Sequence, residues 1–146
     1  MATPIQVVID CADPAALAKF WAAALHYELD DPPPGFDSWP DFLRTQGVPE
    51  SEWNAASAVS DPASQGPRIY FQRVPEPKQG KNRLHLDLNA SGGRETAAAE
   101  RRRKVDAEVE RLLSEGASVF RPGAVSQFGE YWVIMQDPEG NEFCVQ

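Results

Sequence analysis

Polar and hydrophobic residues alternate most regularly near the middle of the chain, over residues 82–89. An alternation with a period of two residues is typical of a β-strand whose two faces meet different surroundings. The leucines Leu84, Leu86 and Leu88 share one face, and His85, Asp87 and Asn89 share the other. Because a buried polar group without a partner costs on the order of a few kcal/mol, we expect this strand either to form a sheet edge or to line a pocket.

Two other stretches have the spacing of amphipathic helices. The first begins at Asp13-Pro14, where an aspartate cap precedes a proline suited to the first helical position. We expect it to end at His26, since histidine tolerates the left-handed conformation that stops many helices. The second helix is expected to end at Gly116. The apolar stripes are Leu17, Phe20, Trp21, Ala24 and Leu25 in the first helix, and Val105, Val109, Leu112 and Leu113 in the second.

Runs of β-branched and aromatic residues predict further strands between turns rich in proline and glycine. These strands cover residues 5–10, 55–60, 68–74, 118–121, 131–136 and 142–146. Pro122-Gly123 and residues 137–141 are expected to be turns, and residues 75–81 are the best linker candidate. Residues 36–53 are an irregular stretch with one helical turn expected at 39–45. Either a lid or a packed surface excursion fits this stretch.

The order of these elements repeats one pattern twice, namely strand, helix and then paired strands. We therefore expect a single domain over residues 1–146, with two βαβββ modules at about 4–74 and 82–146 joined by the linker 75–81. The predicted fold class is α+β, a cupped mixed or antiparallel sheet with the helices on its outer face. By strand alternation the concave face would receive Gln6, Gln72, His85, Asp87 and Cys144.

Composition narrows the possible functions. No apolar run approaches the ~18 residues of a membrane-spanning helix, and the N-terminus lacks the basic and apolar regions of a secretion signal. We therefore expect a cytoplasmic protein without membrane contacts. A net charge of −8 opposes nucleic-acid binding and favours neutral or cationic small molecules. Cys11 and Cys144 have no Cys-x-x-Cys spacing, which argues against a disulfide framework or a structural zinc cluster.

Three motifs carry a resemblance to a known family. They are Asp13-Pro14-x-x-Leu17-x-x-Phe20-Trp21-x-x-x-Leu25, residues 82–88, and Asp137-Pro138-Glu139-Gly140-Asn141-Glu142-Phe143-Cys144-Val145, the last being the most specific. Over nearly its whole length the chain resembles the glyoxalase/bleomycin-resistance/dioxygenase superfamily, also called vicinal oxygen chelate, and most closely its glyoxalase-like domain branch. The resemblance implies paired βαβββ modules around a small-molecule site, completed within one chain or by dimerisation, so we expect a homodimer.

The resemblance also implies positions for a divalent metal. Metal-dependent members take one ligand, usually His or Glu, from the first strand and one from the last strand of each module. Carried over by position, these places are Gln6, Gln72, His85 and Cys144. Only His85 is an ordinary ligand, because glutamine carbonyls bind weakly and a lone cysteine must first lose its proton. Glu142 has the same strand parity as Cys144, but we expect it to face solvent at the turn.

Without a metal, His85 would form a hydrogen bond to Asp87 or to a neighbouring strand. In that case His85, with Asp87 close by, could act as a general base on a bound substrate, because its ordinary pKa lies near neutral pH. Either Tyr131 or Trp132 is expected to face the pocket while the other packs against the helix. Besides His85 and Asp87 as catalytic residues, the expected ligand-binding residues are Gln6, Gln72, Tyr70, Trp132 and Trp53.

Three functions follow as alternatives. The first is a lyase, isomerase or dioxygenase-like enzyme that holds the oxygens of a substrate at a divalent metal near His85. The second is a metal-free module of the bleomycin-resistance type that sequesters a small cationic aromatic compound, in keeping with Trp39, Trp53, Trp132 and the negative charge. The third is a dimerising domain whose cup is empty.

Overall fold

The computed structural model describes residues 1–146 and divides into two compact units, Met1–Pro77 and Lys78–Gln146. The boundary falls within residues 75–81, the segment expected to be a linker. Each unit has its own four-stranded sheet and its own buried apolar residues. No helix in either unit is long and apolar enough to cross a lipid bilayer.

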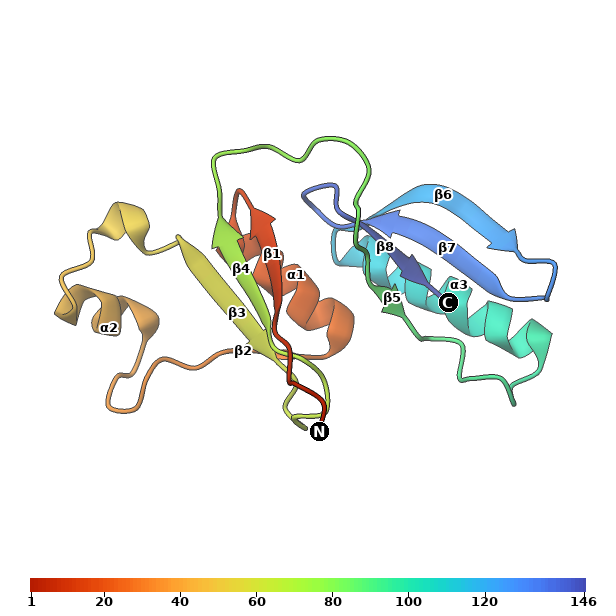
Figure 1. Ribbon diagram of the computed structural model, residues 1–146, viewed down its shortest axis with the longest axis horizontal. Helices are drawn as coiled ribbons and strands as arrows, with labels where there is room; N and C mark the ends of the chain where they lie inside the picture. The colour runs from red at the N-terminus through yellow and green to blue at the C-terminus, as the bar shows by residue number, and fades with distance from the viewer. The chain divides into compact units, whose positions relative to one another are not determined.

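The first unit begins with a strand and a helix, followed by three strands with two short helices inserted among them (Figure 1). Its elements are β1 (Val7–Cys11), α1 (Pro14–Leu25), β2 (Glu28–Leu29), α2 (Trp39–Thr45), the 3₁₀ helix η1 (Glu50–Glu52), β3 (Ala56–Ser60) and β4 (Ile69–Arg73). The sheet has the order β1-β4-β3-β2. Strand β1 pairs parallel with β4, and the other pairs are antiparallel, so the sheet is mixed.

The second unit repeats this topology. Its elements are β5 (Asp87–Leu88), α3 (Ala98–Ser114), β6 (Ser118–Val125), β7 (Tyr131–Gln136) and β8 (Glu142–Val145). The sheet has the order β5-β8-β7-β6, again with the first strand parallel to the last and the other pairs antiparallel. The predicted α+β class with two βαβββ modules is therefore confirmed.

Helix α1 forms where its capping residues predict it. The Asp13 carboxylate accepts a hydrogen bond of 3.1 Å from the backbone N–H of Ala16, and His26 ends the helix in the left-handed conformation with φ 57°. Trp21 is 2% exposed, which confirms its expected place in the core. The apolar stripe of α1 packs on β3 and β4, where the buried side chains are Val59, Ile69 and Phe71. Because burying one such side chain contributes about 1.5–3 kcal/mol, this packing outweighs the single cap.

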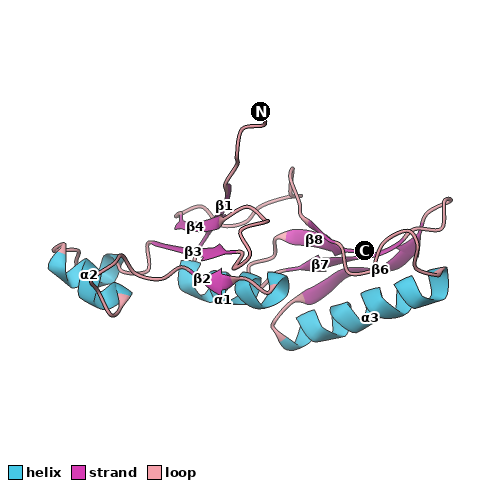
Figure 2. Ribbon diagram, turned by 90° about the horizontal axis from the view of Figure 1, so that it is seen from below, coloured by secondary structure: helices cyan, strands magenta, loops and turns pink.

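Helix α3 covers one face of the second sheet (Figure 2). Its buried residues are Val105, Val109 and Leu112, and they meet Met135, Phe143 and Val145 of β7 and β8. Leu113, which was expected in the same stripe, is 38% exposed. Adjacent helical residues point about 100° apart, so only one of Leu112 and Leu113 can occupy the centre of the stripe.

Two strand predictions differ from the structure. The strand expected at 83–89 is reduced to Asp87–Leu88. Leu84 is exposed and lies beyond the end of β8, the only neighbour of β5, because Glu142 at the start of β8 is level with His85. Pro122-Gly123 is not a turn and lies inside β6. A proline is tolerated there because β6 is an edge strand, and the shifts in its pairing with β7 place irregular backbone around this dipeptide.

The stretch between β2 and β3 contains α2 at Trp39–Thr45, as predicted, capped by the Ser38 hydroxyl, which accepts from the Asp41 N–H. No side chain of α2 is buried. The end of the stretch contacts the rest of the first unit through two side chains. Glu52 forms an ion pair with Arg73 at 2.7 Å, and the Asn54 amide donates a hydrogen bond to the Asp13 carboxylate at 2.8 Å. The lid and the packed surface excursion both stay predictions for this stretch.

We predict that Gly123→Ala destabilises the chain, because Gly123 lies against the ring of Tyr131. A Cβ at this position would lie 2.2 Å from the Tyr131 hydroxyl oxygen and 2.5 Å from the ring carbon Cε2. The ring would have to move and release Asp106, to which its hydroxyl donates a hydrogen bond of 2.6 Å. We expect a loss of about 1–3 kcal/mol in the free energy of urea unfolding. In a Tyr131→Ala background the loss should vanish, and equal losses in both backgrounds would contradict this account.

Candidate functional site on the helix-free face of the second unit

The sheet of the second unit has one face against α3 and one face turned away from it, which we call the helix-free face (Figure 2). Val133, Met135, Phe143 and Val145 are buried toward α3. Their neighbours along each strand point the other way. The strand pairing brings Asp87 of β5, Cys144 of β8 and Ile134 of β7 side by side on the helix-free face.

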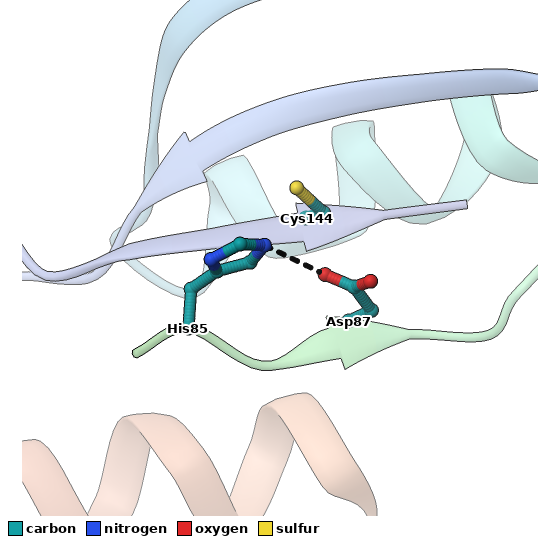
Figure 3. Close-up of side chains that lie close together, drawn as sticks. All are labelled: His85, Asp87 and Cys144. Atoms are coloured by element: carbon teal, nitrogen blue, oxygen red, sulfur yellow. Dashed lines mark ion pairs between the residues drawn. The ribbon is translucent and has the colours of Figure 1, made fainter. Parts of the chain in front are cut away.

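Three side chains on this face approach one another closely (Figure 3). One ligand atom from each of His85, Asp87 and Cys144 lies within 4.8 Å of the others. The His85 Nε2 is 3.4 Å from the Asp87 Oδ1, a contact that becomes an ion pair when the imidazole is protonated. His85 and Asp87 are exposed, whereas Cys144 is half-buried. We call these three residues the His–Asp–Cys cluster.

The backbone between β5 and β8 positions the cluster. The Cys144 N–H donates to the Leu86 carbonyl and the Gln146 N–H donates to the Leu88 carbonyl, each at 2.9 Å. These bonds bracket Asp87, so its side chain and that of Cys144 stand next to each other. His85 lies two residues before Asp87 and therefore projects toward the same side.

The Cys144 thiol holds its proton firmly in this arrangement. Burial raises the pKa of Cys144, and the negative charge of Asp87 and its hydrogen bond with the thiol raise it further, to about 11. The metal-free protein therefore carries a neutral thiol at neutral pH. A cation at the cluster would oppose the effect of Asp87 and favour the thiolate.

The cluster fits a divalent metal by the chemistry of its donors. Imidazole nitrogen, carboxylate oxygen and thiolate sulfur together suit a borderline cation such as Zn²⁺ or Co²⁺. Around such an ion, with bonds of about 2.0–2.3 Å, tetrahedral ligand atoms lie about 3.3–3.8 Å apart. The His85–Asp87 contact is already at this distance. The ligand atoms now lie at most 4.8 Å apart, and the side chains of His85 and Asp87 are exposed, so they have room to rotate toward a bound ion.

The site residues expected in the first module lie on the sheet of the first unit. The Gln6 side-chain oxygen accepts a hydrogen bond of 2.7 Å from Arg68, whose guanidinium also pairs with Asp30 and lies 5.4 Å from the centre of the Tyr70 ring. Gln72 is exposed at the far end of β4 and pairs with Asp10 of β1. The metal role of Gln6 and Gln72 stays a prediction.

The aromatic residues divide between different surroundings. Tyr131 is on the α3 side, where its hydroxyl donates to Asp106, so Trp132 is the member of this pair on the helix-free face. Trp53 contacts residues close to it in the sequence. Its indole N–H donates to the Val48 carbonyl at 2.9 Å, and the Arg44 guanidinium lies 5.4 Å from its ring centre. Trp132 is thus the tryptophan on the same face as the cluster.

Residues 6–146 match the family model of the glyoxalase-like domain. The chain belongs to the glyoxalase-like domain family. No curated protein sequence gives a significant match.

Solved structures of low sequence identity share the fold of this glyoxalase-like chain. A glyoxalase/bleomycin resistance protein/dioxygenase family enzyme from Burkholderia phytofirmans PsJN gives a TM-score of 0.62 at 14% identity, covering 96% of this chain and 94% of that one. A possible glyoxalase from Bacillus cereus gives 0.58 at 14% identity, with coverage of 100% and 99%. Lactoylglutathione lyase from Agrobacterium tumefaciens gives 0.57 at 12% identity, with coverage of 99% and 92%. These likenesses establish the glyoxalase/bleomycin-resistance fold.

The two glyoxalase-like modules can be compared residue by residue. When residues 6–10 are aligned with residues 85–89, Val8 corresponds to Asp87. Val8 pairs with Tyr70 in the first module, just as Asp87 pairs with Cys144 in the second. Tyr70 therefore occupies the place of Cys144, and Gln72 lies two residues beyond it. The sequence contains the signal for this register, since Tyr70 follows Gly66 by four residues as Cys144 follows Gly140.

The expectation that Glu142 faces solvent is wrong. Glu142 is 5% exposed, and its carboxylate lies 3.3 Å from the Lys78 ammonium, 3.4 Å from that of Lys81 and 3.3 Å from the Asn82 N–H. Burial alone would raise the pKa of Glu142. Hydrogen bonds from its own N–H and that of Asn82, together with the Lys78 charge, outweigh burial and hold the pKa below its usual value. Residues 78–82 cover Glu142, which strand parity alone does not reveal.

We predict that Glu142→Gln lowers stability by about 1–3 kcal/mol at pH 7, because hydrogen bonds to a charged group are weakened. The folded-state pKa of Glu142 is lowered, so its contribution is present above the ordinary value of 4.5 and is lost as the pH falls through the folded-state pKa. The difference in unfolding free energy between wild type and Glu142→Gln should therefore be constant between pH 7 and about pH 5 and shrink as the pH falls below 4.5. A difference that does not change with pH would contradict the ionised pairing.

We predict that Cys144 reacts slowly with iodoacetamide in the presence of a chelator, with an apparent pKa of about 11. Asp87→Asn should lower that pKa and speed alkylation at pH 8, because it removes the charge that favours the thiol. A Cys11→Ala background makes Cys144 the single reporting thiol. An unchanged rate in Asp87→Asn would show that Asp87 does not control the thiol.

Proposed function

We propose that this glyoxalase-like chain is a metal-dependent enzyme acting on a small molecule, with His85, Asp87 and Cys144 as the protein ligands of a divalent cation. The observation that carries the proposal is the convergence of three different donor atoms within 4.8 Å. Exposed acidic groups cluster without a metal in many proteins. An imidazole and a half-buried thiol in the same cluster make the donor set more selective than carboxylates alone.

Three protein ligands leave at least one coordination position for a substrate, which is the pattern of catalytic rather than structural sites. A bound cation would supply Lewis acidity to an oxygen of the substrate. The chain would contribute the orientation of that substrate on the helix-free face. Cys144 would release its proton when the cation binds. Asp87 disfavours the thiolate in the free protein, but in the presence of the cation it would be a second negatively charged ligand.

A Lewis acid without redox chemistry suits the lyase and isomerase activities within the family resemblance better than a dioxygenase step. The fold shared with a lactoylglutathione lyase is compatible with this choice, and the substrate of that protein is not transferred here. Assembly as a homodimer stays a prediction, which sedimentation of the purified chain would test.

The second candidate is a metal-free binding protein of the bleomycin-resistance type. The raised pKa of Cys144 favours this candidate, because the thiol stays neutral. Asp87 then interacts with both the Cys144 thiol and the His85 imidazole without a cation. Trp132 on the same face would then serve as the aromatic wall of a ligand site.

Titration with Co²⁺ separates the two candidates. We expect one Co²⁺ per chain, with a thiolate-to-cobalt charge-transfer absorption that is lost in Cys144→Ser and in His85→Ala and retained in the control Cys11→Ala. Affinity should rise about tenfold per pH unit between pH 7 and pH 9, because one proton leaves Cys144 on binding. If no variant differs from wild type, or if no cobalt binds, the metal-dependent function is rejected and the binding protein remains.

A further inference from the structure

The strand pairing that forms the cluster continues as one row of side chains across the second sheet. Asp87 pairs with Cys144, Cys144 with Ile134, and Ile134 with Arg121 of β6. Neighbouring strands lie about 4.8 Å apart, so the backbone positions of Asp87 and Arg121 are about 14 Å apart. The row thus runs from the His–Asp–Cys cluster at one edge of the sheet to Arg121 at the other.

Arg121 is the cation on this row, and it has no carboxylate partner. Its guanidinium lies 5.6 Å from the centre of the exposed Phe120 ring, and it makes no ion pair or hydrogen bond within the chain. Three of the four arginines of α3 differ, since Arg102, Arg103 and Arg111 each pair with an acidic residue of the same helix. The Arg121 fork of N–H donors is therefore available to a planar anion such as a carboxylate.

The middle of the row is apolar. Ile134 lies between Cys144 and Arg121, and Trp132, paired with Ala124, stands two residues along the same strand and on the same face. Both side chains are half-buried. A ligand lying across the sheet would meet donor atoms at one end, an apolar surface in the middle and a positive charge at the other end.

The chain has a net charge of −8, which would disfavour an anionic ligand if the charge were spread evenly over both units. The first unit contains 4 Lys and Arg against 11 Asp and Glu, whereas the second contains 10 against 11. Nearly all of the net charge of −8 therefore belongs to the first unit. The helix-free face of the second unit is part of an almost neutral structure, so a carboxylate is not repelled by its charge as a whole.

We propose that the ligand of this face is an amphipathic carboxylate, with an oxygen donor at the His–Asp–Cys cluster, an apolar body over Ile134 and Trp132, and its carboxylate on Arg121. This inference rests on the proposed function, because it uses the same face as the ligand site. It adds the substrate class, and it makes Arg121 the residue that selects for the charged end.

The test uses 6-hydroxy-2-naphthoate as the probe, because this rigid molecule has a hydroxyl and a carboxylate at opposite ends of an apolar body. Its primary amide, 6-hydroxy-2-naphthamide, has nearly the same shape without the charge. Calorimetric titration into the full chain, with and without Co²⁺, compares wild type with Arg121→Gln and Arg121→Lys. Arg94→Gln is the matched control, since Arg94 is another exposed arginine of the second unit and lies outside the row.

We expect wild type to prefer the carboxylate over the amide. Arg121→Gln should weaken carboxylate binding by about tenfold or more and leave amide binding unchanged, while Arg94→Gln changes neither. Arg121→Lys should retain part of the preference, because it keeps the charge without the planar fork. A thermal unfolding midpoint equal to that of wild type shows that the variants are folded.

The inference is overturned if Arg121→Gln binds both probes as wild type does, if it weakens both equally, or if wild type binds neither. None of these outcomes affects the Co²⁺ titration, which tests the cluster independently of Arg121. Conversely, selective loss of the carboxylate probe in a chain that binds no Co²⁺ supports Arg121 and rejects the metal-dependent function. The two proposals can therefore fail separately.

Discussion

The parallel pairing of β5 with β8 is the constraint on which the candidate site depends. Strand β5 has two residues, yet its backbone hydrogen bonds to Cys144 and Gln146 set the side of the sheet on which every cluster side chain stands. A shift by one residue would turn Cys144 toward α3 and expose Phe143 on the other face. The cost of exposing a large aromatic ring therefore fixes the register, so the core packing of Phe143 and Val145 also maintains the geometry of the site.

Within that geometry, one proton decides the state of the cluster. The Asp87 carboxylate keeps the neighbouring thiol protonated, and the same carboxylate would be a ligand beside the thiolate if a cation were present. The arrangement is thus satisfied in two ways, as a neutral thiol next to an Asp–His pair or as three donors around a metal. Coulomb attraction to a divalent ion is strong enough to reverse the preference of a half-buried thiol.

The two modules share a topology and differ in chemistry. Tyr70 and Arg68 occupy in the first module the places of Cys144 and Glu142 in the second. Arg68 is held by Gln6 and Asp30, whereas Glu142 is buried under the lysines of residues 78–82. Most of the net negative charge also lies in the first unit, because the two units have equal numbers of acidic residues and the first has fewer basic ones. The shared topology therefore gives both modules the same backbone arrangement, and the side chains at matching strand positions give each module its own electrostatics.

The sequence by itself determined the α+β class, the repeated βαβββ order, both long helices and the family, because hydrophobic periodicity, the Asp13-Pro14 cap and the Asp137–Val145 motif are local signals. It also placed His85, Asp87 and Cys144 on one face by parity. Only the tertiary structure decided how short β5 is, that Pro122-Gly123 lies inside an edge strand, that Glu142 is buried, and that Arg121 ends a row beginning at Asp87. These features depend on which strands become neighbours and in what register, and partners distant in the chain leave no periodic trace in the sequence.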